Sequence, residues 1–256
     1  MKLLEKNLDG IKEFLRQDND WLHVNFGYQG TGKSTLLIRM CQAIDPDFCH
    51  ERITFTPEQF LNALRTATYY QAICADEGAT IWFCRNLMSS EVRDSTEILS
   101  MIRAKRLFIG INIDSPTILD KYILYTRGRS ATRIRSKGRF DFFSKRRMRS
   151  IKILPDKKII WPRPNFSDDW QKLGGKFWND YMKIKMKFLN QRLDDKIEKY
   201  SNLIGSKEIC KMLGITRNTL SIWVKKKIIK PVLKTAGGNM RFARDDAERL
   251  KRKLMV

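Results

Sequence analysis

Eight residues near the start of the chain combine glycines, a lysine and a serine at a spacing that suits phosphate binding. They read Gly27-Tyr-Gln-Gly-Thr-Gly-Lys-Ser34, the pattern of glycine, any four residues, glycine, lysine, and serine or threonine. The glycines let backbone N–H groups turn towards phosphate oxygens, Lys33 neutralises phosphate charge, and Ser34 offers its hydroxyl to Mg²⁺. The sequence therefore predicts a P-loop that binds ATP and Mg²⁺ through Gly27, Gly30, Thr31, Gly32, Lys33, Ser34 and Thr35.

An acidic pair follows a short apolar run further along the chain. The run Gln71-Ala-Ile-Cys-Ala75 is typical of a buried strand, and Asp76 and Glu77 come directly after it. If this strand neighbours the strand before the P-loop, one carboxylate can hold Mg²⁺ and the next can polarise the attacking water. We therefore expect Ser34 and Asp76 at the metal, and Glu77 as the catalytic base of ATP hydrolysis.

Other polar side chains could complete this site. The apolar run 107–113 predicts a buried strand beside that of Asp76, and Asn112 near its end could sense the γ-phosphate together with Asp114. Alternatively, Asn112 merely turns the chain. Several arginines follow the acidic pair, and in oligomeric ATPases one such arginine reaches the phosphate of a neighbouring subunit. We select Arg103 and Arg127 as candidates, with surface or DNA contact as the alternative for each.

Strand-like and helix-like segments alternate through the first half of the chain. This alternation predicts the α/β class, with a mainly parallel sheet covered by helices on both faces. We expect a leading helix at 1–18, strands at 21–26, 53–55, 71–75 and 107–113, and helices at 33–43, 56–65, 86–103 and from 116. A P-loop NTPase domain over 1–165, with basic edge strands or hairpins at 131–160, would then be followed by a helical linker at 166–200 and a small domain at 201–256.

The net charge of +22 is concentrated in two segments. Residues 121–163 hold 15 Lys and Arg against 2 Asp and Glu, and residues 201–256 hold 14 against 4, so the rest is nearly neutral. Any one basic run can be solvated surface, but two dense runs outside a neutral core favour contact with nucleic acid. We expect double-stranded DNA as a partner, although 121–163 could instead bind a capsid or a membrane surface.

The second basic segment carries a pattern of two short helices. Ser206 and Gly214 would cap and stop the first helix, and Thr216 would cap the second, which ends near Lys225. Such a helix-turn-helix places the start of its second helix in the major groove, where Arg and Asn suit bidentate contacts to bases. The inward residues would be Ile209, Leu213, Leu220 and Trp223. The expected DNA contacts are Arg217, Asn218, Thr219, Ser221, Lys225, Lys226 and Arg241, with a helical hairpin that docks on protein as the alternative.

The order of short motifs in the first 190 residues resembles a known group of ATPases. The matching stretches are Asp76-Glu-Gly78, Arg85-Asn-Leu-Met-Ser-Ser, Ile102-Arg-Ala-Lys-Arg-Leu-Phe-Ile and Leu119-Asp-Lys-Tyr-Ile. Together with the P-loop they are similar to the small HerA/FtsK-type and zonula-occludens-toxin-like ATPases of viruses, plasmids and integrated elements. The resemblance implies a RecA-like core, a homo-oligomer such as a hexameric ring, and a motor that moves DNA. The sequence departs from that pattern at Gly78, where alanine is common, and has no glutamine after 107–113.

The end of the chain resembles a different family. The segment Gly237-Gly-Asn-Met-Arg-Phe242 is similar to the wing of MerR-like and excisionase-like winged helices. That resemblance implies a wing whose turn needs residues with positive φ and whose Arg241 contacts phosphate. The segment that starts at Asp245 would form the closing helix.

Two functions of different classes fit these residues. The first is a DNA-associated ATPase of a virus or mobile genetic element, in which hydrolysis drives translocation, packaging or nucleoprotein assembly. The second is a DNA-binding regulator, or a transposition or partition accessory protein, in which ATP is a switch without motor activity. A small-molecule kinase is disfavoured, because nothing in the sequence supplies a lid or an acceptor site.

Composition also indicates where such a protein works. No apolar run approaches the ~20 residues that span a bilayer, and the N-terminus mixes charges of both signs, unlike a signal peptide. The five cysteines are widely spaced and form no Cys-x-x-Cys pair, which argues against a disulfide framework or a zinc site. We therefore expect a cytoplasmic protein, in the host cell cytoplasm if it is viral.

Overall fold

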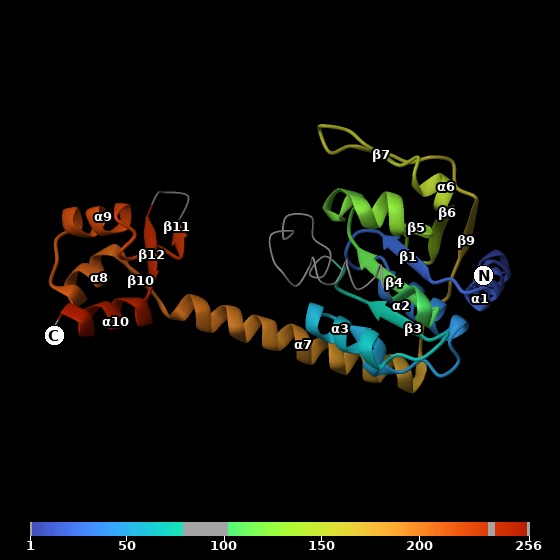
Figure 1. Cartoon of the computed structure of the whole chain (residues 1–256), viewed down its shortest axis with the longest axis horizontal. Coiled ribbons are helices and arrows are strands. Elements are labelled where there is room, and N and C mark those ends of the chain that lie inside the picture. Colours follow the sequence, from blue (N-terminus) through green and yellow to red (C-terminus); the bar gives the residue numbers. More distant parts are fainter. Residues whose placement is uncertain (1, 79–101, 235–238, 255–256) are drawn as a thin grey trace. The chain divides into compact units, whose positions relative to one another are not determined.

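The computed structural model describes residues 2–78, 102–234 and 239–254 and divides the chain into two compact units (Figure 1). The first unit comprises Met1–Tyr181, and the second comprises Met182–Val256. Within the described residues, no helix has both the length and the apolar character that a bilayer span requires.

The first unit is built on a seven-stranded sheet in the order β2-β3-β4-β1-β5-β6-β9. Its strands are β1 (Trp21–Phe26), β2 (Ile53–Thr54), β3 (Ala72–Ala75), β4 (Phe108–Ile113), β5 (Ser130–Ser136), β6 (Arg139–Ser144) and β9 (Phe166–Asp169). The strands from β2 to β5 in this order are parallel, whereas β6 and β9 are antiparallel to their neighbours. The predicted mainly parallel sheet is confirmed, and so is the pairing of the 107–113 strand with the strand before Asp76.

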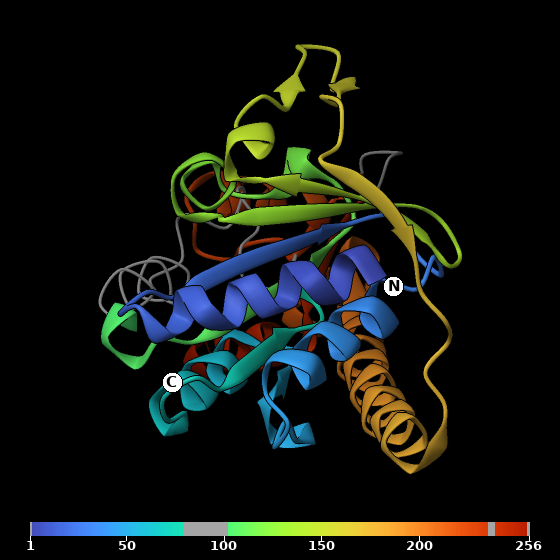
Figure 2. The same ribbon diagram turned by 90° about the vertical axis from the view of Figure 1, so that its right-hand side faces the viewer.

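Helices cover both faces of this sheet (Figure 2). On one face lie α1 (Lys2–Arg16) and α2 (Lys33–Ile44), and on the other lie α3 (Pro57–Thr66), the π-helix η5 (Tyr122–Arg127) and α6 (Lys145–Met148). The 3₁₀ turns η1 (His50–Arg52), η3 (Ile102–Lys105) and η4 (Pro116–Ile118) connect these elements. The helices α1, α2 and α3 are close to their predicted bounds.

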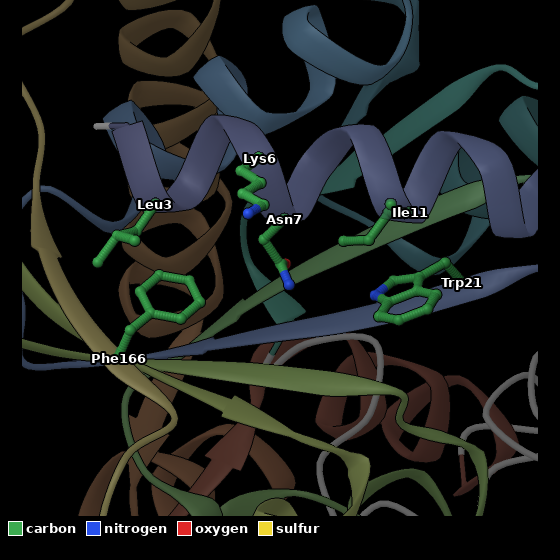
Figure 3. A pocket seen from close by; sticks show the side chains of 7 residues that line it. Leu3, Lys6, Asn7, Ile11, Trp21 and Phe166 are labelled. Atoms are coloured by element: carbon green, nitrogen blue, oxygen red, sulfur yellow. The ribbon is translucent and has the colours of Figure 1, made fainter.

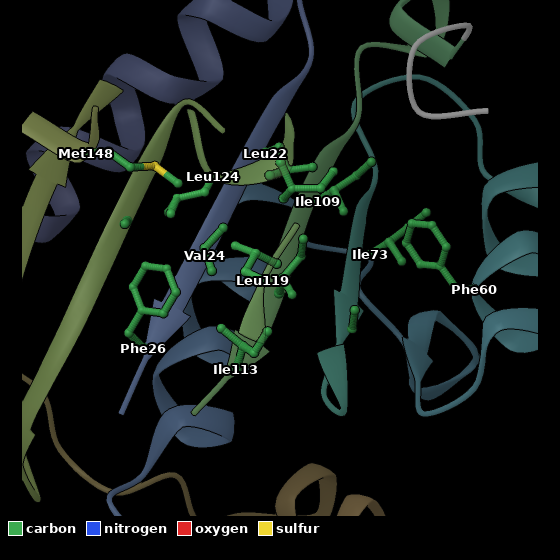
Figure 4. Packing of buried hydrophobic residues seen from close by; sticks show 14 of the residues in the cluster. Leu22, Val24, Phe26, Phe60, Ile73, Ile109, Ile113, Leu119, Leu124 and Met148 are labelled. Atoms are coloured by element: carbon green, nitrogen blue, oxygen red, sulfur yellow. The ribbon is translucent and has the colours of Figure 1, made fainter. Parts of the chain in front are cut away.

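The main core lies between the sheet and the second set of helices (Figure 4). Alternate residues of β1 and β4, such as Val24 and Ile111, are fully buried against residues of α3 and η5, such as Phe60 and Leu124. Burying each side chain of this size contributes about 1.5–3 kcal/mol. On the opposite face a Cβ on Gly110 would lie 2.3 Å from Leu37 Cδ1, so α2 packs on β4 closely enough to require glycine.

The predicted helical linker is wrong at its start. Residues 166–169 form strand β9, and helix α7 begins only at Gly175, running Gly175–Ser201. Phe166 stacks on Phe142 of β6 with ring centroids 4.7 Å apart, and Asp168 Oδ2 accepts a hydrogen bond from the backbone N–H of Leu4. These long-range contacts override the local helical pattern. The P-loop domain therefore extends past 165, to Tyr181.

Other parts of the predicted layout differ as well. Strands β5 and β6 form the predicted hairpin, but they are not edge strands, because β9 lies outside them. The basic segment continues into a separate hairpin of β7 (Lys152–Ile153) and β8 (Ile159–Ile160). The helix predicted from 116 is instead η4 followed by η5. The helix predicted at 86–103 lies largely outside the described residues.

The second unit contains a winged helix-turn-helix. Its elements after α7 are β10 (Leu203–Gly205), α8 (Ser206–Leu213), α9 (Arg217–Lys225), β11 (Leu233–Lys234), β12 (Met240–Ala243) and α10 (Arg244–Leu254). The strands form an antiparallel sheet in the order β10-β12-β11, and β11 and β12 flank the predicted wing turn. The predicted inward residues belong to its core, with Ile209 and Leu220 fully buried.

The caps of the two short helices are partly as predicted. Gly214 ends α8 with φ of 66°, and Thr216 Oγ1 accepts a hydrogen bond from the backbone N–H of Thr219 at the start of α9. Ser206 as the cap of α8 is wrong, because Gly205 occupies that position. The Ser206 hydroxyl donates instead to the carbonyl of Met240, since β12 passes beside this end of α8.

A buried row of polar side chains crosses the α2 face of the large sheet. Trp21 Nε1 donates to Ser130 Oγ at 2.8 Å, Ser130 Oγ lies 2.7 Å from His23 Nδ1, and His23 Nε2 lies 2.9 Å from Asn25 Oδ1. His23 is 0% exposed, and burial lowers its pKa from 6.5 to about 4, so the ring is neutral. Because Asn25 Oδ1 can only accept, Nε2 carries the proton and Nδ1 accepts from Ser130.

We predict that His23 makes stability depend on pH between 6.5 and 4. In this range the unfolded chain binds a proton that the folded chain excludes, so its contribution is complete above pH 6.5 and is lost as pH falls towards 4. The free energy of unfolding should decrease by about 3 kcal/mol over this interval. Denaturant unfolding gives the stability of the wild type and of His23→Gln at each pH. The contributions of the other titrating groups cancel in the difference between the two proteins. If the two proteins lose the same stability as the pH falls from 6.5 to 4, the prediction is contradicted.

Candidate nucleotide site and nucleic-acid interface

The predicted P-loop joins β1 to α2 at the carboxyl ends of the parallel strands. Gly30 and Gly32 have φ of 75° and 97°, a left-handed backbone that favours glycine. A Cβ on Gly27 would lie 3.0 Å from Ile134 Cβ, which leaves little room for a side chain. Helix α2 begins at Lys33, so its first N–H groups and the positive end of its dipole lie at the loop. The loop therefore has the local geometry of a phosphate site.

The Lys33 side chain closes the loop on itself. Its Nζ donates to the carbonyls of Gly27 at 2.6 Å and Tyr28 at 3.0 Å, and it forms an ion pair with Asp114 Oδ1 at 2.7 Å. Asp114 follows β4 and is partly exposed, whereas Lys33 is mostly buried. The lysine is therefore already in place for phosphate, and a bound phosphate would compete with Asp114 for it.

The Asp76 carboxylate is buried, and both of its oxygens accept hydrogen bonds. Oδ1 accepts from Asn112 Nδ2 and Oδ2 from Tyr181 Oη, each at 2.7 Å. The prediction that the Asp76 strand neighbours the P-loop strand is wrong, because β4 lies between β1 and β3. The carboxyl ends of all three strands nevertheless meet at one edge of the sheet. Asn112 therefore bridges the gap between the P-loop strand and Asp76.

Tyr181 is a site residue that no sequence pattern revealed. It lies in the first part of α7 and is 1% exposed, and its hydroxyl bonds to Ser34 as well as to Asp76. Burial and the nearby Asp76 charge raise the Tyr181 pKa well above its usual value, so the hydroxyl remains a donor. Ser34 and Asp76, the two predicted metal ligands, thus lie within reach of one atom. A hydroxyl and a carboxylate at this spacing fit Mg²⁺.

The position directly after the acidic pair has room only for glycine. A Cβ on Gly78 would lie 2.4 Å from Ile111 Cγ2 and 2.6 Å from the Asn112 carbonyl oxygen, which explains glycine at this position. Glu77 is half-buried in the turn between them. Asn112 lies inside β4, so the alternative that it turns the chain is wrong. Its Oδ1 accepts from Asn25 Nδ2 at 3.1 Å, which joins Asp76 to the polar row of His23.

Arg103 and Arg127, the candidates for reaching the phosphate of a neighbouring subunit, lie at the end of the sheet opposite the P-loop. Arg127 forms an ion pair with buried Asp20, which directly precedes β1. Arg103 lies in η3, before β4, and donates to Asn19 Oδ1 at 3.5 Å. Neither is brought to the P-loop of its own chain. Either arginine could therefore contact phosphate only in a neighbouring subunit, and this role stays a prediction.

Trp170 also packs against the P-loop, and no sequence pattern predicted this contact. This buried residue follows β9, and a Cβ on Gly32 would lie 3.0 Å from its ring. The segment predicted as a linker therefore packs against the P-loop.

A separate shallow groove lies between α1 and the sheet and is lined by Leu3, Lys6, Asn7, Gly10, Ile11, Trp21 and Phe166 (Figure 3). No P-loop residue lines it.

The predicted DNA contacts lie along α9 and on β12. Thr219 is half-buried and bonds within the cap, because its Oγ1 lies 2.9 Å from Thr216 Oγ1. The other six are exposed, namely Arg217, Asn218, Ser221, Lys225, Lys226 and Arg241. The structure thus presents the exposed cationic and amide side chains at the start of α9, as groove contact requires.

We predict that Tyr181→Phe tightens Mg²⁺-ATP binding while it lowers stability. Loss of the hydroxyl leaves a buried Asp76 oxygen without its donor, which should cost about 1–3 kcal/mol of unfolding free energy. The same loss frees the oxygens that Mg²⁺ needs, so the affinity should rise by roughly tenfold. Titration calorimetry and thermal unfolding measure the two effects, and Tyr125→Phe, whose hydroxyl bonds to the Ile151 carbonyl, is the matched control. Weaker Mg²⁺-ATP binding would show that Tyr181 does not compete with the metal.

Comparison with known proteins gave a match to a family model and a likeness to a solved structure. Residues 203–254 match the family model described as a helix-turn-helix domain. The chain is also similar to the N-terminal domain of zonular occludens toxin from Neisseria meningitidis, at 14% identity and a TM-score of 0.42, over 60% of this chain and 95% of that one. No curated protein matches the sequence. The strand order and the family match together show a mainly parallel α/β domain with a P-loop, followed by a helix-turn-helix domain.

Proposed function

We propose that the chain is an ATPase that acts on double-stranded DNA for a virus or mobile genetic element. Hydrolysis of ATP to ADP and phosphate would drive DNA translocation, packaging or nucleoprotein assembly. The observation that carries this proposal is the meeting of Lys33, Ser34 and Asp76 at one edge of the sheet, in a chain that also has a helix-turn-helix domain. The motif order, similar to that of HerA/FtsK-type ATPases, favours the motor.

Each residue of the site has a definite task in this proposal. Lys33 and the P-loop N–H groups neutralise phosphate charge, and Ser34 and Asp76 hold Mg²⁺, which supplies further charge neutralisation when bound. Glu77 accepts the proton of the attacking water. Asn112 keeps the Asp76 carboxylate in its orientation through the 2.7 Å hydrogen bond and would sense the γ-phosphate.

A homo-oligomer such as a hexameric ring belongs to the motor proposal. Arg103 and Arg127 lie at the edge of the sheet away from their own P-loop, so a subunit interface would be needed to bring either one to a phosphate. In the motor, one of them would stabilise the charge that develops in the neighbouring site.

A nucleotide switch without motor activity is the second candidate, and one observation favours it. Tyr181 bonds to both predicted metal ligands from α7, and α7 ends only two residues before β10 of the DNA-binding domain. ATP turnover with and without duplex DNA, measured together with oligomer mass, separates the two. DNA-stimulated turnover in a ring supports the motor, whereas a slow, DNA-independent rate in a monomer or dimer supports the switch.

We predict that Lys33→Ala abolishes ATP hydrolysis and leaves DNA binding, measured without nucleotide, unchanged to within about twofold, because the two sites lie in different compact units of the chain. Glu77→Gln should still bind ATP but fail to turn it over. Steady-state phosphate release and fluorescence anisotropy of a labelled duplex measure the two activities. Loss of DNA binding in Lys33→Ala would contradict two separable modules, and ordinary turnover in Glu77→Gln would remove Glu77 from its role.

We predict that the two arginines of the DNA-binding domain have different effects. Arg217→Ala, at the start of α9, should relax preference for the target sequence by about 1–3 kcal/mol of discrimination. Arg241→Ala, on β12, should weaken binding to all sequences about equally and lower the salt dependence by one phosphate contact. Selection from a random duplex pool, followed by salt titrations, measures both. Equal loss of discrimination in the two variants would contradict these assignments.

A further inference from the structure

The part of α7 that belongs to the second unit carries an exposed apolar stripe. Its members are separated by 4, 3, 4, 4 and 3 residues, so at 100° per residue they fall within about 80° of one another around the helix. Each is between 38% and 59% exposed. The stripe consists of Met182, Met186, Leu189, Leu193, Ile197 and Tyr200. A narrow stripe of this kind is the seam of a coiled coil.

This stripe is distinct from the face that packs within the first unit. Phe177 stacks on His50 with ring centroids 4.0 Å apart, and Tyr181 reaches Asp76. Phe177 and Tyr181 are one turn apart, and their side of the helix is roughly 140° from the centre of the stripe. The side chains that hold the start of α7 on the P-loop domain therefore do not belong to the stripe.

We propose that the stripe pairs with the same stripe of a second copy of this chain, as an antiparallel coiled coil centred between Leu189 and Asn190. In this register Met182 faces the partner's Ile197, and Met186 faces the partner's Leu193. The two copies are then related by a two-fold axis, so that every apolar contact occurs twice. All apolar members except the terminal Tyr200 find an apolar partner or lie at the axis.

Charges beside the stripe favour the same antiparallel direction. One flank carries Lys183 and Lys187 in its first half, and Asp194 and Glu198 in its second half. In an antiparallel pair this flank meets itself, so Lys187 faces the partner's Asp194 and Lys183 faces the partner's Glu198. A parallel pair would instead set Lys187 near the partner's Arg192, where like charges repel. Charge complementarity therefore favours the antiparallel direction, with the charge pairs centred one residue beyond the apolar pairs.

Cations on the other flank of the stripe should make the pairing of the two helices depend on DNA. Lys185, Arg192 and Lys196 lie on it, and an antiparallel pair gathers these cations of both copies on one side, where they repel. DNA phosphates would neutralise them. The ends of the two helices at Ser201 would be about 33 Å apart, which is close to one turn of duplex. Pairing should thus be tighter when a duplex with two half-sites is bound.

A charge swap tests the pairing in the full chain without nucleotide. Lys187→Glu should weaken the dimer by about tenfold, and Lys187→Glu combined with Asp194→Lys should restore it, as sedimentation velocity measures with and without duplex. Gln191→Glu, on the side of α7 opposite the stripe, is the control and should change nothing. A double variant that dissociates as much as Lys187→Glu would overturn the proposal, as would a wild type that stays monomeric with and without DNA.

Disulfide trapping tests the direction independently of affinity. Chains with Lys183→Cys, mixed with chains with Glu198→Cys, should form a cross-link between unlike chains under mild oxidation. Each variant alone, and the wild type with its native cysteines, provide the background. A yield in the mixture no greater than that of the separate variants would exclude the antiparallel register. The position of the cross-link also distinguishes this pair from contacts made by a ring of P-loop domains.

Discussion

The site depends on satisfying one buried carboxylate. Asp76 lies at the end of a fully buried strand, where an unpaired charge would cost several kcal/mol. Asn112 and Tyr181 offset that cost, because each donates a 2.7 Å hydrogen bond to one of the two carboxylate oxygens. Behind Asn112, the donors of the polar row through His23 and Asn25 all point the same way, so each bond polarises the next towards Asp76. The carboxylate is therefore held in one orientation before any metal binds.

This constraint explains features of the fold that are otherwise unrelated. Asn112 can reach both Asn25 and Asp76 only because β4 lies between β1 and β3. The close fit of Gly78 against Ile111 and of Gly110 against α2 keeps that strand in position. The second oxygen of Asp76 takes its donor from Tyr181, which fixes where the first turns of α7 must lie. The predicted metal ligand Asp76, the strand β4 and the start of α7 are thus positioned by one set of hydrogen bonds.

Sequence reasoning succeeded where the signal is local. The P-loop, the strand before Asp76 and the Thr216 cap each depend on residues within a few positions of one another, and their patterns follow from backbone geometry alone. The position of β4, the strand at 166–169 and the roles of Trp170 and Tyr181 depend on partners far away in the chain. Nothing in the local sequence distinguishes Tyr181 from its exposed neighbour Met182. Packing of the start of α7 against Asp76, 105 residues away in the chain, selects between them, and the local sequence does not contain that information.

The two faces of α7 suggest how nucleotide and DNA could influence each other. A ligand shifts a conformational equilibrium only by the difference in its affinity for the two states. In the proposed site, Mg²⁺ would need oxygens of Ser34 and Asp76 that Tyr181 already engages, so Mg²⁺-ATP would favour the state in which this end of α7 is released. Pairing through the stripe acts on the other end of the same helix and is favoured by DNA. Because a helix transmits a change at one end to the other, each ligand would alter the affinity for the other by the same factor.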